Sequence, residues 1–348
     1  MLALAMAGAG YSFLRRGRMQ PVASNFQRMK VLKLTDSGNV STASISPDGR
    51  YVAYAIHEGQ QSSLWMRQVA TESAVELVSP AAADYFGVTF SSDGDYLYFV
   101  PNQKGTEDAD AYIVPVLGGR PRLILRDVDS AIGASRDGKQ IAFVRGNIPE
   151  VSQLLVANSD GTSEHVVADT VATKSGRFYS YAAPSWSADG KLIALPIILQ
   201  HFSGIFVTPA AGGQPTILAS GNFVTSTSWL PDQSGLLINA STTFAGAKQI
   251  WQQPYPTGQP QRLTNDLNSY PSASSTADGQ QFATVQVQSL ITIFMANAST
   301  PDEGKPLNTG RSDGIGLAWL PDGKLLSQDV NSQLLGVIGR RTRSCRCS

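Results

Sequence analysis

Cysteine is almost absent from this chain. Its two cysteines, Cys345 and Cys347, both lie among the last four of 348 residues. A disulfide framework is therefore excluded over the rest of the chain. Hydrophobic residues make up 42% of the composition, so the fold has to depend on a buried apolar core. We interpret the Cys-x-Cys motif as incidental, within a disordered basic tail at residues 339–348.

An excess of charge of one sign is also missing. The sequence has 27 basic and 27 acidic side chains, and charged residues are only 16% of the total. A nucleic-acid-binding protein typically shows a basic patch or stripe, so we expect no nucleic-acid partner. The chain contains 3 histidines, which are His57, His165 and His201.

Long hydrophobic runs are lacking except at the N-terminus, where residues 1–14 are small or apolar and Arg15, Arg16 and Arg18 follow. This run is shorter than the roughly 20 residues that span a membrane. We interpret residues 1–18 as a membrane-anchor or signal-like segment, most simply the second half of a helix that begins outside this chain. Residues 19–28 would be a linker. A location at the membrane or outside the cytoplasm follows, although the positive-inside rule would place the arginines in the cytoplasm.

One short motif recurs along the whole chain. It begins as "ISPDGRYVAY" at 45–54 and returns as "FSSDGDYLYF" at 90–99 and "WSADGKLIAL" at 186–195. The motif aspartates lie 43 to 52 residues apart at Asp48, Asp93, Asp137, Asp189, Asp232, Asp278 and Asp322. Four short strands every 40 to 50 residues are typical of propeller blades. The sequence therefore predicts an all-β propeller of four-stranded blades over residues 29–338.

The motif predicts a tight turn rather than a catalytic site. Glycine allows the left-handed backbone that such a turn needs, and the aspartate can accept hydrogen bonds from backbone N–H groups. The glycines are Gly49, Gly94, Gly138, Gly190, Gly235, Gly279 and Gly323. In the fifth copy, "WLPDQSGLLI", the glycine comes two positions late, and we expect a longer turn there. These aspartates and glycines are interpreted as structural.

The residue three positions before each aspartate is generally large. Ile45, Phe90, Trp186, Trp229 and Trp319 occupy this position, whereas Ala134 and Ser275 are small exceptions. We expect the large residue to pack between neighbouring blades. Seven motifs predict seven blades, with six, eight or an incomplete ring as alternatives. The segment "MKVLKLT" at 29–35 could supply the fourth strand of the seventh unit and so close the ring, protecting its sheet edges.

The repeats resemble TolB-like propellers of the PD40 (WD40-like) type, whose unit centres on W-S-P-D-G followed by I-A-F. The order of an apolar segment, arginines, "NFQRMKVLKLTDSGNVSTASISPDGRYVAY" (25–54) and "YIVPVLGGRPRLILRDVDS" (112–130) is also similar to the C-terminal propeller of bacterial membrane-anchored Ser/Thr protein kinases. That resemblance implies a sensor role. The chain itself has no Gly-rich phosphate loop, H-R-D or D-F-G motif, so the implied role is non-catalytic.

Candidate functional residues should lie where the repeat is interrupted. The longest spacing contains the insertion "TVATKSGRFYSYAAP" (170–184), with Arg177, Phe178, Tyr179 and Tyr181. Long loops on rigid scaffolds often carry function, and aromatics beside arginine are typical of recognition surfaces. The alternative is that these rings pack over a blade edge. His57 and His201 both follow the second strand of their units and are expected at the same face, as further members of the candidate binding loop.

The most direct functional hypothesis is a monomeric sensor or scaffold propeller that binds a protein, peptide or glycan. We expect no catalytic residue, no metal and no cofactor. The sequence "GRSDG" (310–314) matches a nucleophile-elbow pattern, but no histidine follows it, as that site would require. The alternatives are a propeller-type polysaccharide lyase or glycosidase and a TolB-like cell-envelope scaffold.

Overall fold

The computed structural model describes residues 32–104, 109–148, 151–170, 176–179, 181–199, 203–219, 222–242, 246–266, 268–288 and short strands beyond them. Every regular element in these ranges is a β-strand. No helix among them is long and apolar enough to cross a membrane. Residues 1–31 lie outside the described ranges, so the anchor and linker predictions stay predictions. Met1–Asp36 and Ser37–Ser348 form separate compact units.

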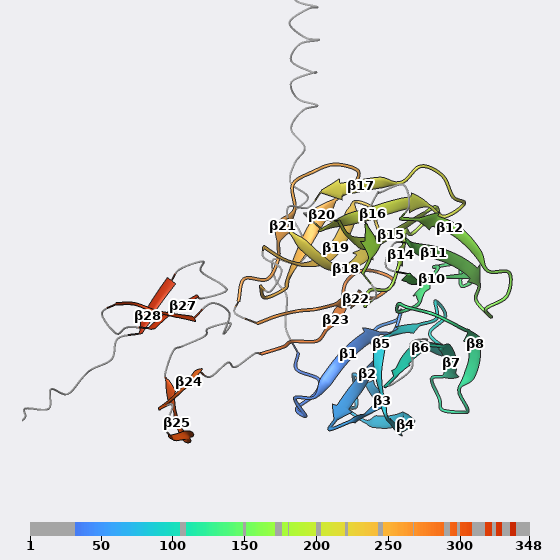
Figure 1. Ribbon diagram of the computed structural model, residues 1–348. Helices are drawn as coiled ribbons and strands as arrows, with labels where there is room; N and C mark the ends of the chain where they lie inside the picture. Colours follow the sequence, from blue (N-terminus) through green and yellow to red (C-terminus); the bar gives the residue numbers. More distant parts are fainter. Residues whose placement is uncertain are drawn as a thin grey trace, which may run out of the picture. The chain divides into compact units, whose positions relative to one another are not determined.

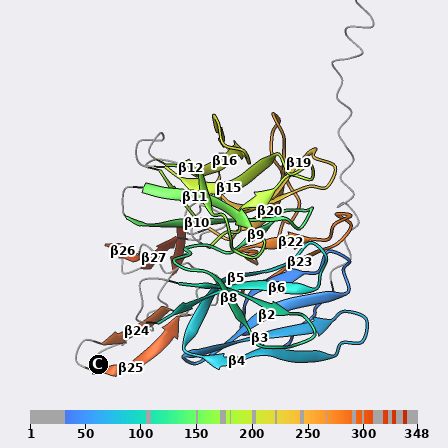
Figure 2. The same cartoon turned by 90° about the vertical axis from the view of Figure 1, so that its right-hand side faces the viewer.

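The second unit contains five antiparallel sheets of four or five strands, which follow one another along the chain, and three smaller sheets after them; the blades are seen in Figures 1 and 2. Blade 1 consists of β1 (Val40–Ile45), β2 (Tyr51–Glu58), β3 (Gln61–Gln68) and β4 (Ala74–Ala81). Blade 2 consists of β5 (Ala83–Phe90), β6 (Tyr96–Gln103), β7 (Ala111–Pro115) and β8 (Arg122–Leu125). Blade 3 consists of β9 (Gly133–Ala134), β10 (Gln140–Ile148), β11 (Val151–Asn158) and β12 (His165–Asp169).

Blade 4 has five strands: β13 (Arg177–Phe178), β14 (Ser185–Trp186), β15 (Leu192–Ile198), β16 (Ser203–Pro209) and β17 (Thr216–Ala219). Blade 5 consists of β18 (Phe223–Trp229), β19 (Gly235–Ser241), β20 (Gln249–Pro254) and β21 (Gln261–Arg262). A sixth unit contains β22 (Ala273–Ser275) paired with β23 (Phe282–Thr284). Further on, β24 (Ile293–Asn297) pairs with β25 (Thr300–Leu307), and β26 (Leu317–Trp319), β27 (Leu325–Gln328) and β28 (Leu335–Ile338) form a three-stranded sheet.

The repeated turn is built from one local hydrogen-bond network. In blade 1 the Ser46 hydroxyl donates to Asp48 Oδ1 at 2.7 Å, and the N–H of Arg50 donates to the same oxygen at 3.0 Å. The N–H of Tyr51 in turn donates to Ser46 Oγ at 2.9 Å. Blades 2, 3 and 4 and the sixth unit repeat the serine- or threonine-to-aspartate bond. The prediction that this aspartate fixes a turn is confirmed wherever the turn is described; Asp322 and Gly323 lie outside the described residues.

The fifth turn has the same length as the others, so the prediction of a longer turn was wrong. The N–H of Leu230 donates to the carbonyl of Gly235 at 2.9 Å, as that of Ser46 donates to Tyr51 at 2.8 Å. Gln233 takes the left-handed place with a φ of 58°, where Gly49 has 74°. Gly235 instead begins β19. An L-residue can be held in this conformation at a modest cost, so the shifted glycine did not require a longer turn.

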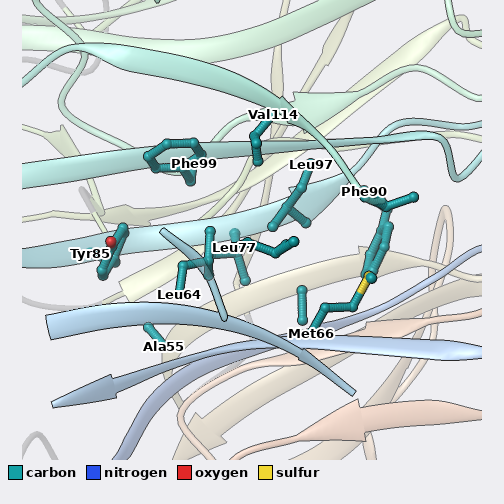
Figure 3. Packing of buried hydrophobic residues seen from close by; sticks show 12 residues of the cluster. Ala55, Leu64, Met66, Leu77, Tyr85, Phe90, Leu97, Phe99 and Val114 are labelled. Carbon is teal, nitrogen blue, oxygen red and sulfur yellow. The ribbon is translucent and has the colours of Figure 1, made fainter. Parts of the chain in front are cut away.

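The core lies between neighbouring blades, as expected from the large position of the repeat. Figure 3 shows Met66 of blade 1 reaching towards the ring of Phe90 of blade 2, within one buried cluster. Trp186 belongs in the same way to a cluster with strands of blade 3, and Trp229 to one with strands of blade 4. Blades 2, 4 and 5 therefore place the large residue of their first strand against the preceding blade.

The sixth unit lies against both blade 5 and blade 1. The first strands of the blades contact one another in a closed cycle: β1 touches β5, β5 touches β9, β9 touches β14, β14 touches β18, β18 touches β22, and β22 touches β1. Ser274 Oγ accepts a hydrogen bond from the N–H of Ile45 at 2.8 Å. The N–H of Ala277 donates to the Pro47 carbonyl at 2.9 Å. Arg136 of blade 3 also reaches the sixth unit, and its Nη1 donates to the carbonyl of Ala277 at 2.9 Å.

The prediction of a propeller with four-stranded antiparallel blades is thus confirmed, whereas seven blades are not. Five blades are complete in the described residues, and the neighbour of blade 1 is the sixth unit. The predicted closing strand at 29–35 is not confirmed either, because residues 32–36 form no strand and residues 29–31 lie outside the described ranges. The sixth unit instead contacts blade 1 through β22 and β1, and the sequence pattern did not identify these two strands as neighbours.

Replacing Gln233 with glycine should stabilise the protein by about 0.5–1 kcal/mol, since the left-handed conformation costs an L-residue about that amount or more. The matched change is Gly190→Ala. Gly190 has a φ of 71°, and a Cβ there would meet no atom within 4 Å. That substitution should cost about 1 kcal/mol through backbone strain alone. Urea unfolding of both variants measures the effects, and equal signs would contradict this account of the turn.

Acid should weaken the repeated turns. Burial alone would raise the pKa of Asp48, but the N–H of Arg50, the Ser46 hydroxyl and the Arg50 guanidinium lower it from 3.8 to about 2. Since the unfolded chain then binds the proton more tightly, this stability is present above pH 3.8 and is lost as the pH falls towards about 2. The pKa values of Asp93, Asp137, Asp189 and Asp278 are lowered as well, chiefly by the neighbouring Ser or Thr hydroxyl.

The free energy of unfolding, measured in urea between pH 5 and pH 2, should therefore decrease steadily with acidification. Asp48→Asn should lower stability at pH 7 by about 1–2 kcal/mol and should flatten the pH dependence. An Asp48→Asn variant with the same pH slope as the parent would show that this carboxylate is not responsible.

Candidate binding site

The insertion before blade 4 forms an added strand rather than a free loop. Arg177 and Phe178 of β13 pair with Ile198 and Ile197 of β15. Arg177 is exposed, whereas Phe178 is 2% exposed and meets Phe206 edge to face, with ring centroids 5.0 Å apart. Phe178 is therefore part of the blade 4 core and offers no ring to a ligand. For this residue, the alternative that the insertion packs over the blade holds.

The two tyrosines of the insertion lie at the surface. Tyr181 is 61% exposed, and its ring meets Phe86 edge to face at 5.4 Å. Tyr179 is half-buried and lies 6.0 Å from Tyr181 between ring centroids. Burial raises the pKa of Tyr179, and Tyr181 adds to this effect. Phe86 belongs to β5 of blade 2, so the contact connects two blades that are not neighbours.

His57 is connected to β5, the strand that carries Phe86, through Asp84. It stands close to the end of β2, where its Nδ1 is 3.0 Å from Ser62 Oγ and 3.2 Å from Asp84 Oδ1. Asp84 precedes Phe86 by two residues on β5, in a part of the strand whose register with β6 shifts between Tyr85 and Val88. We call His57, Asp84, Phe86, Tyr179 and Tyr181 the aromatic surface. It joins side chains from blades 1, 2 and 4.

The structure brings together two predicted residues, Tyr179 and Tyr181, and it links His57 to the start of β5 through Asp84; the role of these residues in binding stays a prediction. Arg177 is on the adjacent strand, and His201 lies outside the described residues. Ser312, Cys345 and Cys347 also lie outside them. Asp84 and Phe86 were missed, although the pair Tyr85-Phe86 at the start of a first strand was a usable signal.

The chemistry of the aromatic surface is that of recognition. Exposed tyrosine edges offer apolar area with a polar tip at little conformational cost, and they stack on sugars, prolines or other rings. The His57–Asp84 pair adds a hydrogen-bonding edge whose imidazole is 39% exposed. In the part of the chain that the structure describes, no three His, Cys, Asp or Glu side chains are grouped as a metal site.

Comparison with solved structures shows the fold. A presumed TolB protein from Agrobacterium tumefaciens matches with a TM-score of 0.56 and 18% identity, over 74% of this chain and 93% of that chain. TolB from Acinetobacter baumannii matches with a TM-score of 0.52 and 13% identity, over 86% of this chain and 63% of that one. Oligogalacturonate lyase from Vibrio parahaemolyticus matches at 0.49 with 12% identity, over 88% and 91% of the two chains, which is too low to carry an argument.

No protein-family pattern matches the sequence, and neither does any curated protein sequence. At these identities the likeness supports a TolB-like propeller fold and leaves activity open, because one fold hosts many functions.

Replacing Phe178 and Tyr181 with alanine, one at a time, should distinguish a ring of the buried core from a ring of the surface. Phe178→Ala should lower the free energy of unfolding by about 3–5 kcal/mol, as expected for a buried ring. Tyr181→Ala should cost less than about 1 kcal/mol, because its ring is largely exposed. Urea unfolding tests both, and a large loss with Tyr181→Ala would show that the aromatic surface is part of the fold's core.

Proposed function

We propose that this chain is a non-catalytic propeller that binds a protein, peptide or glycan through the aromatic surface. The observation that supports this most directly is that the repeated residues have structural roles, whereas the residues that differ between blades are available for binding. The repeated aspartates are engaged in turn hydrogen bonds, whereas His57 and Tyr181, which have no repeat counterparts, each contact the start of β5, through Asp84 and Phe86 respectively.

Three kinds of contact are offered to the ligand. The Tyr181 ring presents a broad apolar face, supported from below by Phe86 and Tyr179. Since the supporting rings are themselves partly buried, Tyr181 is held in place before a ligand arrives, which limits the entropy lost on binding. Asp84 and His57 supply an acceptor and an imidazole for hydrogen bonds to hydroxyl or amide groups.

The finer form of the proposal is a sensor propeller tethered at the membrane through residues 1–18 and acting outside the cytoplasm, as in a kinase-type receptor. The resemblance to kinase-linked propellers and the apolar N-terminal run support it. A TolB-like envelope scaffold would use the same surface for a protein partner, and the test below separates the two by the ligand that binds.

The purified chain should be screened against a printed glycan array and an array of short peptides, and each hit titrated by calorimetry. Tyr181→Ala should weaken the hit at least about tenfold, as expected when a central ring of a binding surface is truncated. The matched control is Val75→Ala, since Val75 is 52% exposed on β4 of blade 1, away from the aromatic surface.

A ligand that binds Tyr181→Ala as tightly as the unmodified chain, or that Val75→Ala weakens to the same extent as Tyr181→Ala does, would contradict the proposal. Turnover of a polysaccharide by the unmodified chain would contradict its non-catalytic part. A glycan or peptide hit favours the sensor, and a folded envelope protein captured in a Tyr181-dependent manner favours the scaffold.

A further inference from the structure

Blade 3 departs from the repeat where it meets blade 2. The first strand of each other complete blade carries a large residue at the position that packs on its neighbour, for example Phe90 against Met66. Blade 3 has Ala134 there, packed against the cluster that contains Tyr98 and Ile113 of blade 2. A methyl group cannot fill the space that a phenyl or indole ring occupies elsewhere, so room remains between the two blades.

That room is a cavity of about 430 Å³, open to the turn end of the blades. It is lined by residues of both blades, including Tyr98, Arg120, Arg122, Ala134, Gln140 and Asp160. Its volume lies within the range of small-ligand sites, which is roughly 300–1,000 Å³.

The cavity is bounded by close contacts on two sides, which keep it open without a ligand. On the inner side, a Cβ on Gly138 would come within 2.6 Å of Ser92 Oγ. On the outer side, Gly161 approaches the carbonyl of Ile124 so closely that no Cβ would fit. Between them, the hydroxyl of Tyr98 donates to the carbonyl of Ser159 at 3.2 Å. These contacts join blades 2 and 3 around the cavity.

Two guanidinium groups of the cavity form no ion pair with the residues that the structure describes. Ion pairs among those residues engage Arg50, Arg67, Arg126 and Arg145. Arg120 and Arg122 line the cavity together with the carboxylates of Asp93 and Asp160, and Arg122 contributes to the lowered pKa of Asp160 without contacting it as an ion pair. A planar guanidinium binds a carboxylate through two parallel hydrogen bonds. The pair is thus suited to receive a carboxylate from outside.

The cavity also offers acceptors for N–H groups. Asp160 Oδ1 already accepts the N–H and hydroxyl of Thr162 at 2.9 and 2.7 Å. These bonds lower the pKa of Asp160, with a smaller contribution from Arg122, so the carboxylate stays ionised at neutral pH. Its second oxygen makes no hydrogen bond among the described residues and can accept one from a ligand amide. The side-chain amide of Gln140 provides both a donor and an acceptor.

The rim beside the arginines is apolar. Leu117 is 90% exposed in the loop before Arg120, and Tyr96, which lines the cavity, is 43% exposed. These two residues belong to blade 2 and lie near Pro115, which pairs with Tyr96 across β6 and β7. An occupant with an apolar side chain next to its carboxylate would bury this surface.

We infer that the cavity between blades 2 and 3 binds the free C-terminal end of a peptide whose last side chain is apolar. The terminal carboxylate lies against Arg120 and Arg122, a backbone N–H donates to Asp160, and the last side chain fills the space above Ala134. This site is at the other end of β5 from the aromatic surface and does not depend on the function proposed there.

The test uses the full chain and three probes followed by calorimetry: acetyl-Ala-Ala-Leu with a free carboxylate, the same peptide amidated, and amidated acetyl-Ala-Glu-Leu. The free acid should bind at least about tenfold more tightly than its amide, since one charge-assisted pair is lost. The glutamate peptide separates a side-chain carboxylate from a terminal one. Equal affinity of the free acid and either amidated peptide, or no binding of any probe, would overturn the inference.

Two substitutions locate the site. Ala134→Phe restores the repeat's large residue and should abolish binding without lowering the unfolding temperature. Arg122→Gln should lower the affinity for the free-acid peptide to that for the amidated peptide. The control is Arg126→Gln, which should leave the affinity unchanged, because the Arg126 guanidinium pairs with Asp110 at 3.6 Å outside the cavity. Unaltered binding in Arg122→Gln would overturn the assignment even if Ala134→Phe failed to fold. Tyr181→Ala should have no effect, so this inference and the proposed function can fail separately.

Discussion

The architecture depends on a hydroxyl–carboxylate–amide network that fits within six residues. A serine or threonine hydroxyl and a backbone N–H share one aspartate oxygen, and the hydroxyl oxygen accepts the N–H that begins the second strand. Blades 1 to 4 and the sixth unit thereby place their first two strands in a defined register, whereas in blade 5 Leu230 replaces the hydroxyl residue and Asp232 accepts the N–H and hydroxyl of Ser234 instead. The turns also set how closely some neighbours approach, because the left-handed glycine of a turn lies against a side chain of the preceding unit, as Gly279 does against Pro231 and Gly138 against Ser92.

The network also explains where specificity can develop. Because the turn residues determine the pairing register of the first two strands, the amino acid can vary between blades only at other positions. One such position is the large residue of the first strand, where Ala134 replaces a ring and opens a space between blades. Another is the segment between blades, where the insertion adds β13 to blade 4 and brings Tyr181 to Phe86.

The sequence predicted what local chemistry determines. The turns, the strand order within each blade and the packing of Phe90, Trp186 and Trp229 all follow from residues close together in the chain. The burial of Phe178 could not be predicted, because it requires pairing with a strand about twenty positions later. The left-handed Gln233 was missed because a glycine nearby suggested another turn. The partnership of Asp84 with His57, and that of β22 with β1, depend on how blades meet, which no repeat pattern encodes.

The hydrogen bond between Ile45 and Ser274 joins residues 229 positions apart in the sequence. The hydrogen bond from Arg136 to Ala277 joins residues 141 positions apart. Both bonds can form only after most of the intervening chain has been ordered, so the entropy of closing that loop falls on a few late contacts. Until then β1 exposes an unprotected side at the start of the array. The sixth unit is the last part of the cycle to be synthesised, and its contacts with blade 1 close the cycle. Until the sixth unit has folded, the protein is vulnerable to misassembly.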